Sequence, residues 1–402
     1  MIKKITRIYL TSTGGIALGQ SFFFATYQLF LVGHHLSYLE INLINLAYMI
    51  SCFLLEIPTG AYADVFGRRK SVIIGCLTLS LSFLVYFLSR SFWLFIIAEI
   101  IGAFGSTFIS GALEAWMVDS LRQANYQGDL EKIYEKEGRY RLVGLIIGSS
   151  SGAWLASFDL AYPWLASAVG LALVSLYVYR ALPKNGASQE HLGFSLKAIQ
   201  QTARDSIHYG YHHRGLFYLI GFGACLALAF QAFNMQWPIV FSDYGLKVTK
   251  MGWIFAASAL TNFLGTQLAR PFLRLVSQKW QQSEKTALIW SQGVTALGMI
   301  ISASGFGLYP VLSAFLLHEI GRGLWRPLKQ AYLNRRINDT QRATVLSFDS
   351  MIAQLGAGVG LLISGWLADA FSIATAWFVS ALLISAAILI FSRLKNGEEK
   401  NR

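Results

Sequence analysis

Residues 56–70 read Glu56-Ile-Pro-Thr-Gly60-Ala-Tyr-Ala-Asp64-Val-Phe-Gly67-Arg68-Arg69-Lys70. This short charged stretch separates two long apolar segments. Glycine permits tight turns and close approach of helices, so Gly60 and Gly67 predict a sharp connection between two helices. We therefore expect the charged residues to lie at a membrane surface, with an apolar helix on either side.

The composition of the whole chain supports a membrane protein. Of its 402 residues, 54% are hydrophobic and only 13% are charged, whereas about a quarter of the residues in soluble domains are charged. A spanning helix needs about 20 apolar residues, so the chain has room for about a dozen. Apolar segments centre near residues 20, 51, 80, 106, 148 and 171, and again near 229, 260, 294, 322, 356 and 382. The predicted fold class is an all-α membrane protein with twelve transmembrane helices.

The two sets of apolar segments predict a domain organisation. Residues 1–182 form an N-terminal six-helix half, residues 183–214 a cytoplasmic linker, and residues 215–402 a C-terminal half. In the linker, Leu192, Leu196 and Ile199 follow helical spacing beside basic residues, which indicates an amphipathic helix at the membrane surface.

The distribution of lysine and arginine predicts the orientation. Most of the 33 cationic residues fall in segments on one side, while the loops expected outside hold only Arg90, Lys247 and Lys250. Basic residues favour the cytoplasmic side of a membrane. We therefore expect the protein to lie in the cytoplasmic (inner) membrane, with both termini in the cytoplasm. The net charge of +12 therefore reflects topology and does not indicate binding to nucleic acid. The apolar run after Lys3, Lys4 and Arg7 is expected to be a retained first helix, not a cleaved signal.

A weak internal repeat relates the two halves. Residues 25–29 (ATYQL) align with residues 233–237 (FNMQW), Glu99-Ile-Ile-Gly102 aligns with Glu319-Ile-Gly321, and residues 151–156 (SGAWLA) align with residues 364–369 (SGWLAD). The order of the three matches is preserved. Two related halves around a central site are therefore expected.

The loop Gly60-x-x-x-Asp64-x-x-Gly67-Arg68-Arg69 resembles the signature loop of the major facilitator superfamily. Together with Glu56-Ile-Pro58, residues 111–121 (GALEAWMVDSL) and residues 342–347 (RATVLS), it makes the chain similar to the bacterial drug-efflux branch. The resemblance implies two pseudo-symmetric six-helix halves and a gating role for Gly60, Asp64, Gly67, Arg68 and Arg69. In this superfamily Asp64 would face the N-terminus of the eleventh apolar segment, which opens at Arg342, and a carboxylate at such a helix end gains about 0.3–2 kcal/mol.

Acidic residues within apolar segments are the candidates for proton coupling. Charged side chains are costly in a membrane and usually face a cavity or a partner, and a buried carboxyl can bind and release a proton near neutral pH. A permanent structural ion pair is the alternative for each. In the fourth apolar segment, centred near residue 106, Glu99 stands where many proton-using relatives carry an arginine. The candidates are Glu56, Glu99, Glu114, Asp119, Glu319 and Asp349.

The fifth apolar segment, centred near residue 148, contains Gly144-x-x-x-Gly148-Ser149-Ser150-Ser151-Gly152. This pattern is partly similar to the antiporter signature of the superfamily, with Ser149 in place of the usual proline. Small residues at four-residue spacing also indicate close packing between helices in any membrane protein, so both interpretations remain open.

His318, Arg322, Arg326 and Lys329 share one face of the tenth segment. One interpretation is an anion-binding face for a carboxylate- or phosphate-bearing substrate, since arginine can make bidentate contacts. The other is internal pairing, in which Glu319 pairs with Arg322, and Glu114 or Asp119 pairs with Lys329 or Arg335 as an inner gate.

The first and seventh apolar segments, centred near residues 20 and 229, supply a mixture of aromatic and uncharged polar side chains that suits bulky, partly apolar ligands. With the two arginines of the tenth segment, the substrate-cavity candidates are Gln20, Phe24, Tyr27, Gln28, Gln231, Asn234, Gln236, Trp237, Arg322 and Arg326.

These features predict a proton-coupled secondary transporter that exports small amphipathic compounds by alternating access. The alternatives are a carrier of organic anions or metallophores and, from another class, a non-transporting membrane sensor or lipid-handling protein. No GxxxxGK[ST] phosphate loop and no nucleophile with its base are present, so we expect neither nucleotide-driven pumping nor an enzyme. We expect no catalytic residue, no cofactor and no metal site. The expected partners are a small-molecule substrate, protons and the lipid bilayer, with no nucleic acid, and the protein is expected to be a monomer.

Overall fold

The computed structural model describes residues 1–183, 214–279, 284–334, 337 and 342–393. The described residues form helices and connecting turns, without a strand. The predicted amphipathic linker lies almost entirely outside these residues.

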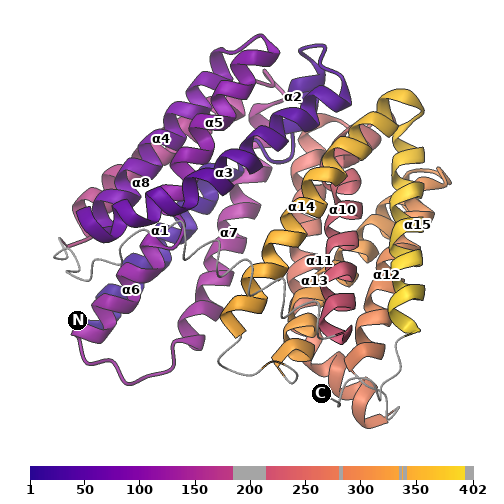
Figure 1. Ribbon diagram of the computed structural model, residues 1–402. Coiled ribbons are helices and arrows are strands. Elements are labelled where there is room, and N and C mark those ends of the chain that lie inside the picture. Colours follow the sequence, from indigo (N-terminus) through magenta and orange to yellow (C-terminus); the bar gives the residue numbers. More distant parts are fainter. Residues whose placement is uncertain (184–213, 280–283, 335–336, 338–341, 394–402) are drawn as a thin grey trace. The chain divides into compact units, whose positions relative to one another are not determined.

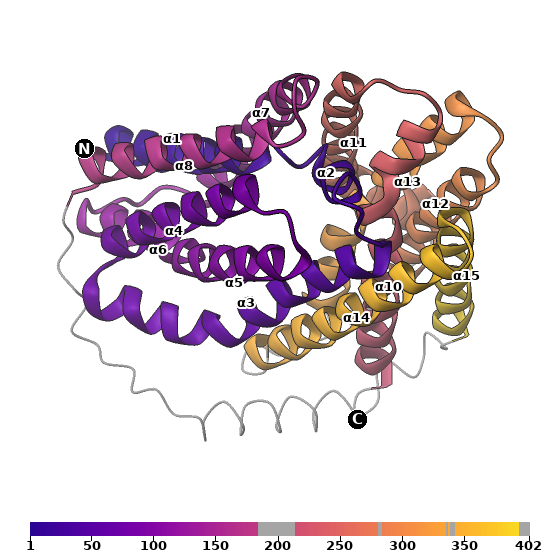
Figure 2. The same ribbon diagram turned by 90° about the horizontal axis from the view of Figure 1, so that it is seen from above.

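The described part of the first half of the chain contains eight α-helices (Figure 1). They are α1 (Ile2–Ser21), α2 (Tyr27–Val32), α3 (Tyr38–Phe66), α4 (Arg68–Leu88), α5 (Phe92–Ile109), α6 (Ala112–Gln123) and α7 (Glu131–Leu155), and α8 (Tyr162–Ala181) follows. Within this half α1 packs on α7 and α8, and α4 packs on α5 and α8, as Figure 2 shows from above.

The second half contains the remaining helices described. They are α10 (Arg214–Asp243), α11 (Val248–Arg274), α12 (Glu284–Ala303), α13 (Leu308–Asn334), α14 (Arg342–Ala370) and α15 (Ile373–Ser392), with a π-helical turn at Leu275–Lys279 after α11. α12 packs on α13 and α15, while α10 packs on α14 and α15.

Eight helical segments of the described chain are long and apolar enough to cross a membrane, with α5 and α6 counted as one. The longer helices α1, α7, α11 and α13, which carry more polar residues, complete a twelve-helix arrangement, which confirms the predicted fold class. Many large apolar side chains, including Leu54, Leu173 and Leu355, are exposed along these helices. Such surfaces suit a lipid environment, where the solvent is itself apolar.

Two of the membrane helices are interrupted. α1 ends at Ser21 and α2 starts at Tyr27, and α5 ends at Ile109 before α6 starts at Ala112. At the second break Gly111 has φ = +69°, a left-handed conformation that glycine adopts without steric cost. Neither break contains proline, so neither was predicted from the sequence.

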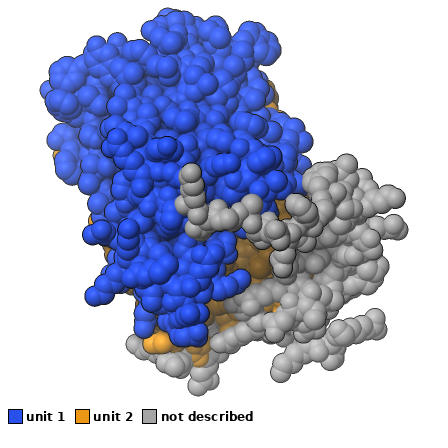
Figure 3. Space-filling model, turned by 90° about the vertical axis from the view of Figure 1, so that its left-hand side faces the viewer, with its two compact units in different colours: residues 1–36, 43–194, 245–256 blue, residues 37–42, 195–244, 257–402 orange. Residues whose placement is uncertain are grey.

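The chain divides into two compact units (Figure 3). Unit 1 comprises residues 1–36, 43–194 and 245–256, and unit 2 comprises residues 37–42, 195–244 and 257–402. The first turn of α3 therefore belongs to unit 2, and the first turns of α11 belong to unit 1. The halves at residues 1–182 and 215–402 stay a prediction.

Candidate functional site

The loop between α3 and α4 turns at Gly67, whose φ is +97°. Arg68, the first residue of α4, places its guanidinium 2.9 Å from Asp64 and 3.6 Å from Asp119 of α6. One cation thus lies between two acids predicted for gating and coupling, and all three side chains remain partly exposed.

Arg69 and Gly60 complete the predicted gating loop. Arg69 donates a hydrogen bond to the Tyr179 carbonyl of α8, and its guanidinium carbon lies 4.9 Å from the centre of the Tyr179 ring. Gly60 lies inside α3, where a Cβ atom would meet no described atom within 4 Å. None of the described residues therefore packs closely against Gly60.

Glu99 of α5 lies among tyrosine hydroxyls. Its Oε1 accepts a hydrogen bond of 2.6 Å from Tyr86 of α4, and Tyr27 of α2 lies at 3.4 Å. Asn45 of α3 donates to the Tyr27 hydroxyl at 2.9 Å. Among the described residues no cation forms an ion pair with Glu99, so the carboxyl is held by neutral donors alone.

An aromatic cluster fixes these hydroxyls. The Trp164 ring of α8 is stacked between Phe23 and Tyr86, with ring centres 4.0 Å and 3.9 Å away. Tyr27 approaches the same ring edge-on at 5.8 Å. Because Trp164 is only 1% exposed, the cluster is a packed part of unit 1, and it orients Tyr86 toward Glu99.

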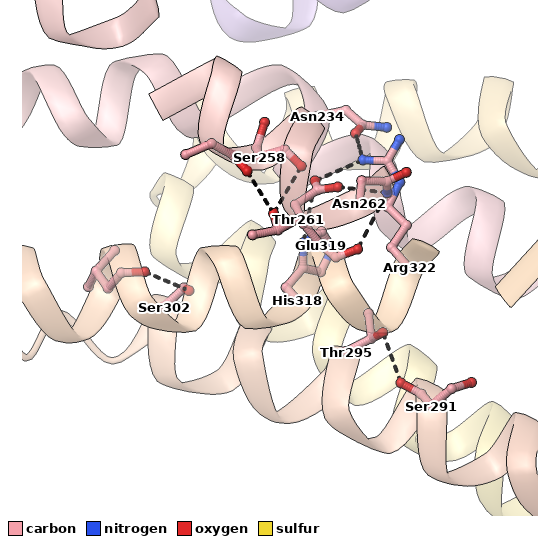
Figure 4. Close-up of polar contacts among 12 residues, drawn as sticks. Asn234, Ser258, Thr261, Asn262, Ser291, Thr295, Ser302, His318, Glu319 and Arg322 are labelled. Carbon is pink, nitrogen blue, oxygen red and sulfur yellow. Dashed lines mark hydrogen bonds and ion pairs between the residues drawn. The ribbon is translucent and has the colours of Figure 1, made fainter. Parts of the chain in front are cut away.

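Glu319 of α13 is held in a different way. Its Oε1 lies 3.0 Å from Nη1 of Arg322, one turn along the same helix, and its Oε2 accepts from Asn262 of α11 at 3.0 Å. Nη1 of Arg322 also donates to Asn234 of α10 at 2.6 Å (Figure 4). This geometry supports the internal-pairing interpretation for Arg322. Arg326, by contrast, is exposed.

Lys329 and Asp349 form a second ion pair in unit 2. Nζ of Lys329 lies 2.6 Å from both carboxylate oxygens of Asp349 on α14. From the sequence, Glu114 or Asp119 was one predicted partner of Lys329. In the structure the partner of Lys329 is Asp349. Asp119 instead pairs with Arg68, and Arg335 lies outside the described residues.

The other two acidic candidates are exposed. Glu56 lies on α3, and Glu114 accepts a hydrogen bond of 2.8 Å from Tyr134 of α7. Glu114 also lines a polar cavity of about 270 Å³ in unit 1 together with Gln20, Tyr9, Glu137 and Arg141. Among the predicted substrate-cavity residues, all of which the structure describes, Gln20 lines this cavity.

The remaining cavity candidates divide by burial. Gln28, Gln236 and Trp237 are buried, and Gln236 donates to the Ser364 carbonyl at 3.0 Å. Gln231 donates to Ala227 of its own helix at 3.2 Å. The partly exposed cavity candidates are Phe24, Tyr27, Gln231 and Asn234. A ligand could contact these four side chains without disturbing the packing between helices.

The glycine pattern of α7 faces α1. A Cβ atom at Gly144 would lie 2.5 Å from the Gly14 carbonyl oxygen, and at Gly148 or Gly152 it would overlap Ser21 or Phe22. These glycines therefore permit close contact at the point where α1 ends. The packing interpretation of this motif accounts for all three glycines.

Several residues of these clusters were not selected from the sequence. Tyr86 and Asn262 each donate a hydrogen bond to an intramembrane acid, whereas Asn45 donates to the hydroxyl of Tyr27, which itself lies beside Glu99. The available signal was a polar side chain inside an apolar segment, which is costly unless it has a partner. Trp164 gave no such signal, because its contribution depends on packing among helices.

With this geometry in place, comparison with known proteins defines the class. The family model for the Major Facilitator Superfamily matches residues 9–129 and 217–402, and the chain belongs to this family of membrane transporters. Its substrate class is therefore a small molecule and its environment is the lipid bilayer.

Individual relatives are distant. The chain is 23% identical to the uncharacterized MFS-type transporter YxaM of Bacillus subtilis (strain 168), over 96% of this chain and 95% of that one. It is 21% identical to the multidrug resistance protein MdtH of Escherichia coli (strain K12 / DH10B), over 77% and 73% of the two chains. The crystal structure of the nucleoside transporter NupG matches with a TM-score of 0.80, 14% identity and coverage of 100% and 99%. This last likeness shows the fold alone.

Proposed function

We propose that the protein is a proton-coupled exporter of small amphipathic compounds that works by alternating access in the cytoplasmic membrane, with both termini in the cytoplasm. The observation that carries the proposal is Glu99, an intramembrane carboxyl whose described partners are the neutral hydroxyls of Tyr86 and Tyr27. A carboxyl that lacks a permanent cation can alternate between protonated and charged forms more easily than one in an ion pair.

The contrast with Glu319 strengthens this assignment. The Glu319 carboxylate is only 9% exposed and lies 3.0 Å from Arg322. Removing the charge of Glu319 by protonation would leave Arg322 without its counter-charge, which is costly inside a membrane. Of these two carboxyls, we therefore assign the transported proton to Glu99.

The surroundings of Glu99 suit an amphipathic substrate. Phe24, Tyr27 and the packed rings around Trp164 offer apolar surface beside hydroxyl and amide groups. Pockets of this composition bind partly apolar molecules without strict geometric demands. The likeness to MdtH, a multidrug resistance protein, agrees with this class of substrate.

Transport in inverted membrane vesicles tests the proposal. Vesicles that contain the protein should accumulate ethidium, a lipophilic cation, when respiration supplies an acidic interior. Collapse of the pH gradient with nigericin should abolish the accumulation. Uptake that persists without the gradient, or no uptake of ethidium with the gradient intact, would contradict the proposal.

A carrier of organic anions is the second candidate. It is favoured by Arg326, which is exposed on α13 and forms no ion pair with the described residues. The human organic anion transporter MFSD10 shares the fold, with a TM-score of 0.64 over 97% of this chain and 99% of that one. In the same vesicles, gradient-dependent movement of radiolabelled benzoate without movement of ethidium would establish this function instead.

A further inference from the structure

His318 of α13 is a buried histidine without a hydrogen bond. Its side chain has 0% exposure, and among the described residues neither ring nitrogen has a hydrogen-bond partner. Buried polar atoms in proteins are nearly always hydrogen-bonded, so an exception calls for an explanation. The proposed transport function does not use this residue.

The charged group nearest to the His318 ring is the carboxylate of Glu319. Nδ1 of His318 lies 3.6 Å from Oε1 of Glu319, slightly beyond hydrogen-bond distance. The same oxygen lies 3.0 Å from Nη1 of Arg322. Two groups that can carry positive charge therefore approach one carboxylate oxygen, and Arg322 is the one now bound (Figure 4).

His318 and Arg322, the two residues that could pair with Glu319, differ in their exposure. The Arg322 side chain is 32% exposed, whereas Glu319 is 9% exposed and His318 is fully buried. Arg322 can therefore move toward solvent while Glu319 cannot. The second carboxylate oxygen of Glu319 is held by Asn262 at 3.0 Å, which keeps the carboxylate in place.

The helices around His318 add no other described charge at the ring. α10 contributes the aromatic rings of Phe230 and Phe233, with Asn234 near Arg322, and α13 contributes Phe315. On α12, Gly298 lies against the His318 backbone, and on α11 Asn262 reaches Glu319. Among the described groups that face the imidazole, the charged ones are Glu319 and Arg322.

We propose that His318 is a proton-binding positioning residue that exchanges with Arg322 for Glu319. In the tautomer with hydrogen on Nε2, the Nδ1 lone pair accepts a proton, and the new Nδ1–H donates to Oε1 of Glu319. The ion pair between Arg322 and Glu319 breaks in the same step. One cation replaces another beside the carboxylate, so the charge buried around Glu319 stays the same while the guanidinium becomes free.

The exchange has a consequence for ligands. A free guanidinium binds carboxylate and phosphate groups through two parallel hydrogen bonds. An anionic group of a substrate would then bind at Arg322 only after His318 takes up a proton. This consequence rests on the second candidate function, the carrier of organic anions, whereas the exchange itself is a property of unit 2.

Arginine labelling on the purified full-length protein tests the exchange without any transport assay. Phenylglyoxal modifies accessible guanidinium groups, and mass spectrometry of peptides gives the ratio of modification at Arg322 to that at Arg326. Because Arg326 is exposed one turn along the same helix, the ratio cancels the pH dependence of the reagent. We expect the ratio to rise severalfold from pH 8.5 to pH 4.

The variant His318→Gln should keep the ratio low at every pH, since glutamine takes up no proton in this range. His34→Gln is the matched control, because His34 of unit 1 already has a partner, the Phe30 carbonyl at 2.8 Å from Nδ1. It should retain the wild-type profile. His318→Asn replaces His318→Gln if the latter does not fold.

Two results would overturn the proposal. A wild-type ratio that stays flat with pH would show that Arg322 is not released. A ratio that still rises in His318→Gln would assign the proton to Glu319 itself. Neither result depends on whether ethidium or benzoate is transported, so failure of this inference is distinct from failure of the proposed function.

Discussion

At the scale of single residues, the described interior acids differ in the charge of their partners. Asp349 has Lys329, Glu319 has Arg322, and Glu99 has only hydroxyl groups. An ion pair resists a change of protonation because its partner would be left uncompensated. The structure therefore distinguishes two acids that are paired with cations from Glu99, whose described partners are neutral.

The pair of Lys329 and Asp349 gives a stability prediction. The two side chains are 10% and 14% exposed, so Lys329→Met would leave a buried carboxylate without a partner. We expect a loss of about 3–5 kcal/mol in the free energy of unfolding. The double variant Lys329→Met, Asp349→Leu should recover most of the loss. Chemical unfolding in detergent measures both, and a double variant as unstable as the single one would contradict the assignment.

The sequence predicted part of this residue-level arrangement. The pairing of Glu319 with Arg322 followed as one alternative from their spacing on one helix. The partner of Lys329 was not predicted, because Asp349 lies on another helix and only tertiary packing brings the two together. The hydroxyl of Tyr86 was missed for the same reason.

At the scale of elements, the glycines of α7 decide how closely α1 can pack. A Cβ atom at Gly152 would overlap the Phe22 carbonyl, so Gly152→Ala must move one helix or the other. Overpacking of this kind costs about 1–3 kcal/mol or more. Gly138→Ala is the matched control on the same helix, since its Cβ would meet no described atom within 4 Å.

We expect Gly152→Ala to lower the thermal unfolding temperature in detergent. Gly138→Ala should leave it unchanged or raise it slightly, because alanine favours a helix over glycine by about 1 kcal/mol. Equal effects of the two substitutions would show that contact with α1 is not the reason for the glycine at position 152.

The first turn of α3 is fixed within unit 2 by Asp369 of α14. The Asp369 carboxylate accepts from the backbone N–H groups of Tyr38 and Leu39 at 2.9 Å and 2.8 Å. Asn42 donates to the Leu361 carbonyl at 2.8 Å. A carboxylate at a helix N-terminus both accepts from unpaired amides and stabilises the helix dipole.

Removing this cap should loosen the turn. In Asp369→Ala we expect faster hydrogen exchange at residues 37–42, with a loss of about 0.5–2 kcal/mol in local stability. Asp159→Ala, which removes a hydrogen bond to the Ala161 N–H ahead of α8, should leave the 37–42 peptide unaffected. Unchanged exchange in Asp369→Ala would contradict the capping role.

Element boundaries were less predictable than element number. The apolar pattern runs through residues 22–26 and through Ser110 and Gly111, so the sequence indicated one continuous helix at each place. Packing breaks them instead: at the first break the glycines of α7 contact the end of α1. The turn at Gly67 was predicted, because glycine between an apolar segment and a charged run is typical of a tight turn.

At the scale of the whole molecule, the amino-acid composition alone indicated a membrane protein built from helices. A chain with few charged residues and repeated apolar segments must bury its backbone polar groups in helices within lipid. The twelve-helix fold and the family follow this expectation. The assignment of residues to compact units could not be read from the sequence, because α3 and α11 each contribute to both units.

We propose that Glu99 couples proton movement to transport, and transport by the purified protein in liposomes tests this role. Two assays separate coupling from movement of the protein: accumulation of ethidium driven by an imposed pH gradient, and exchange of ethidium across the membrane without a gradient. Glu99→Gln should lose gradient-driven accumulation and keep exchange, because glutamine cannot carry a proton but leaves the alternating motion intact.

Asp64→Asn serves as the comparison, because the gating loop is proposed to control the alternation itself, and this variant should lose both activities while being produced at normal levels. If Glu99→Gln still accumulates ethidium against its gradient at the wild-type rate, Glu99 does not carry the transported proton.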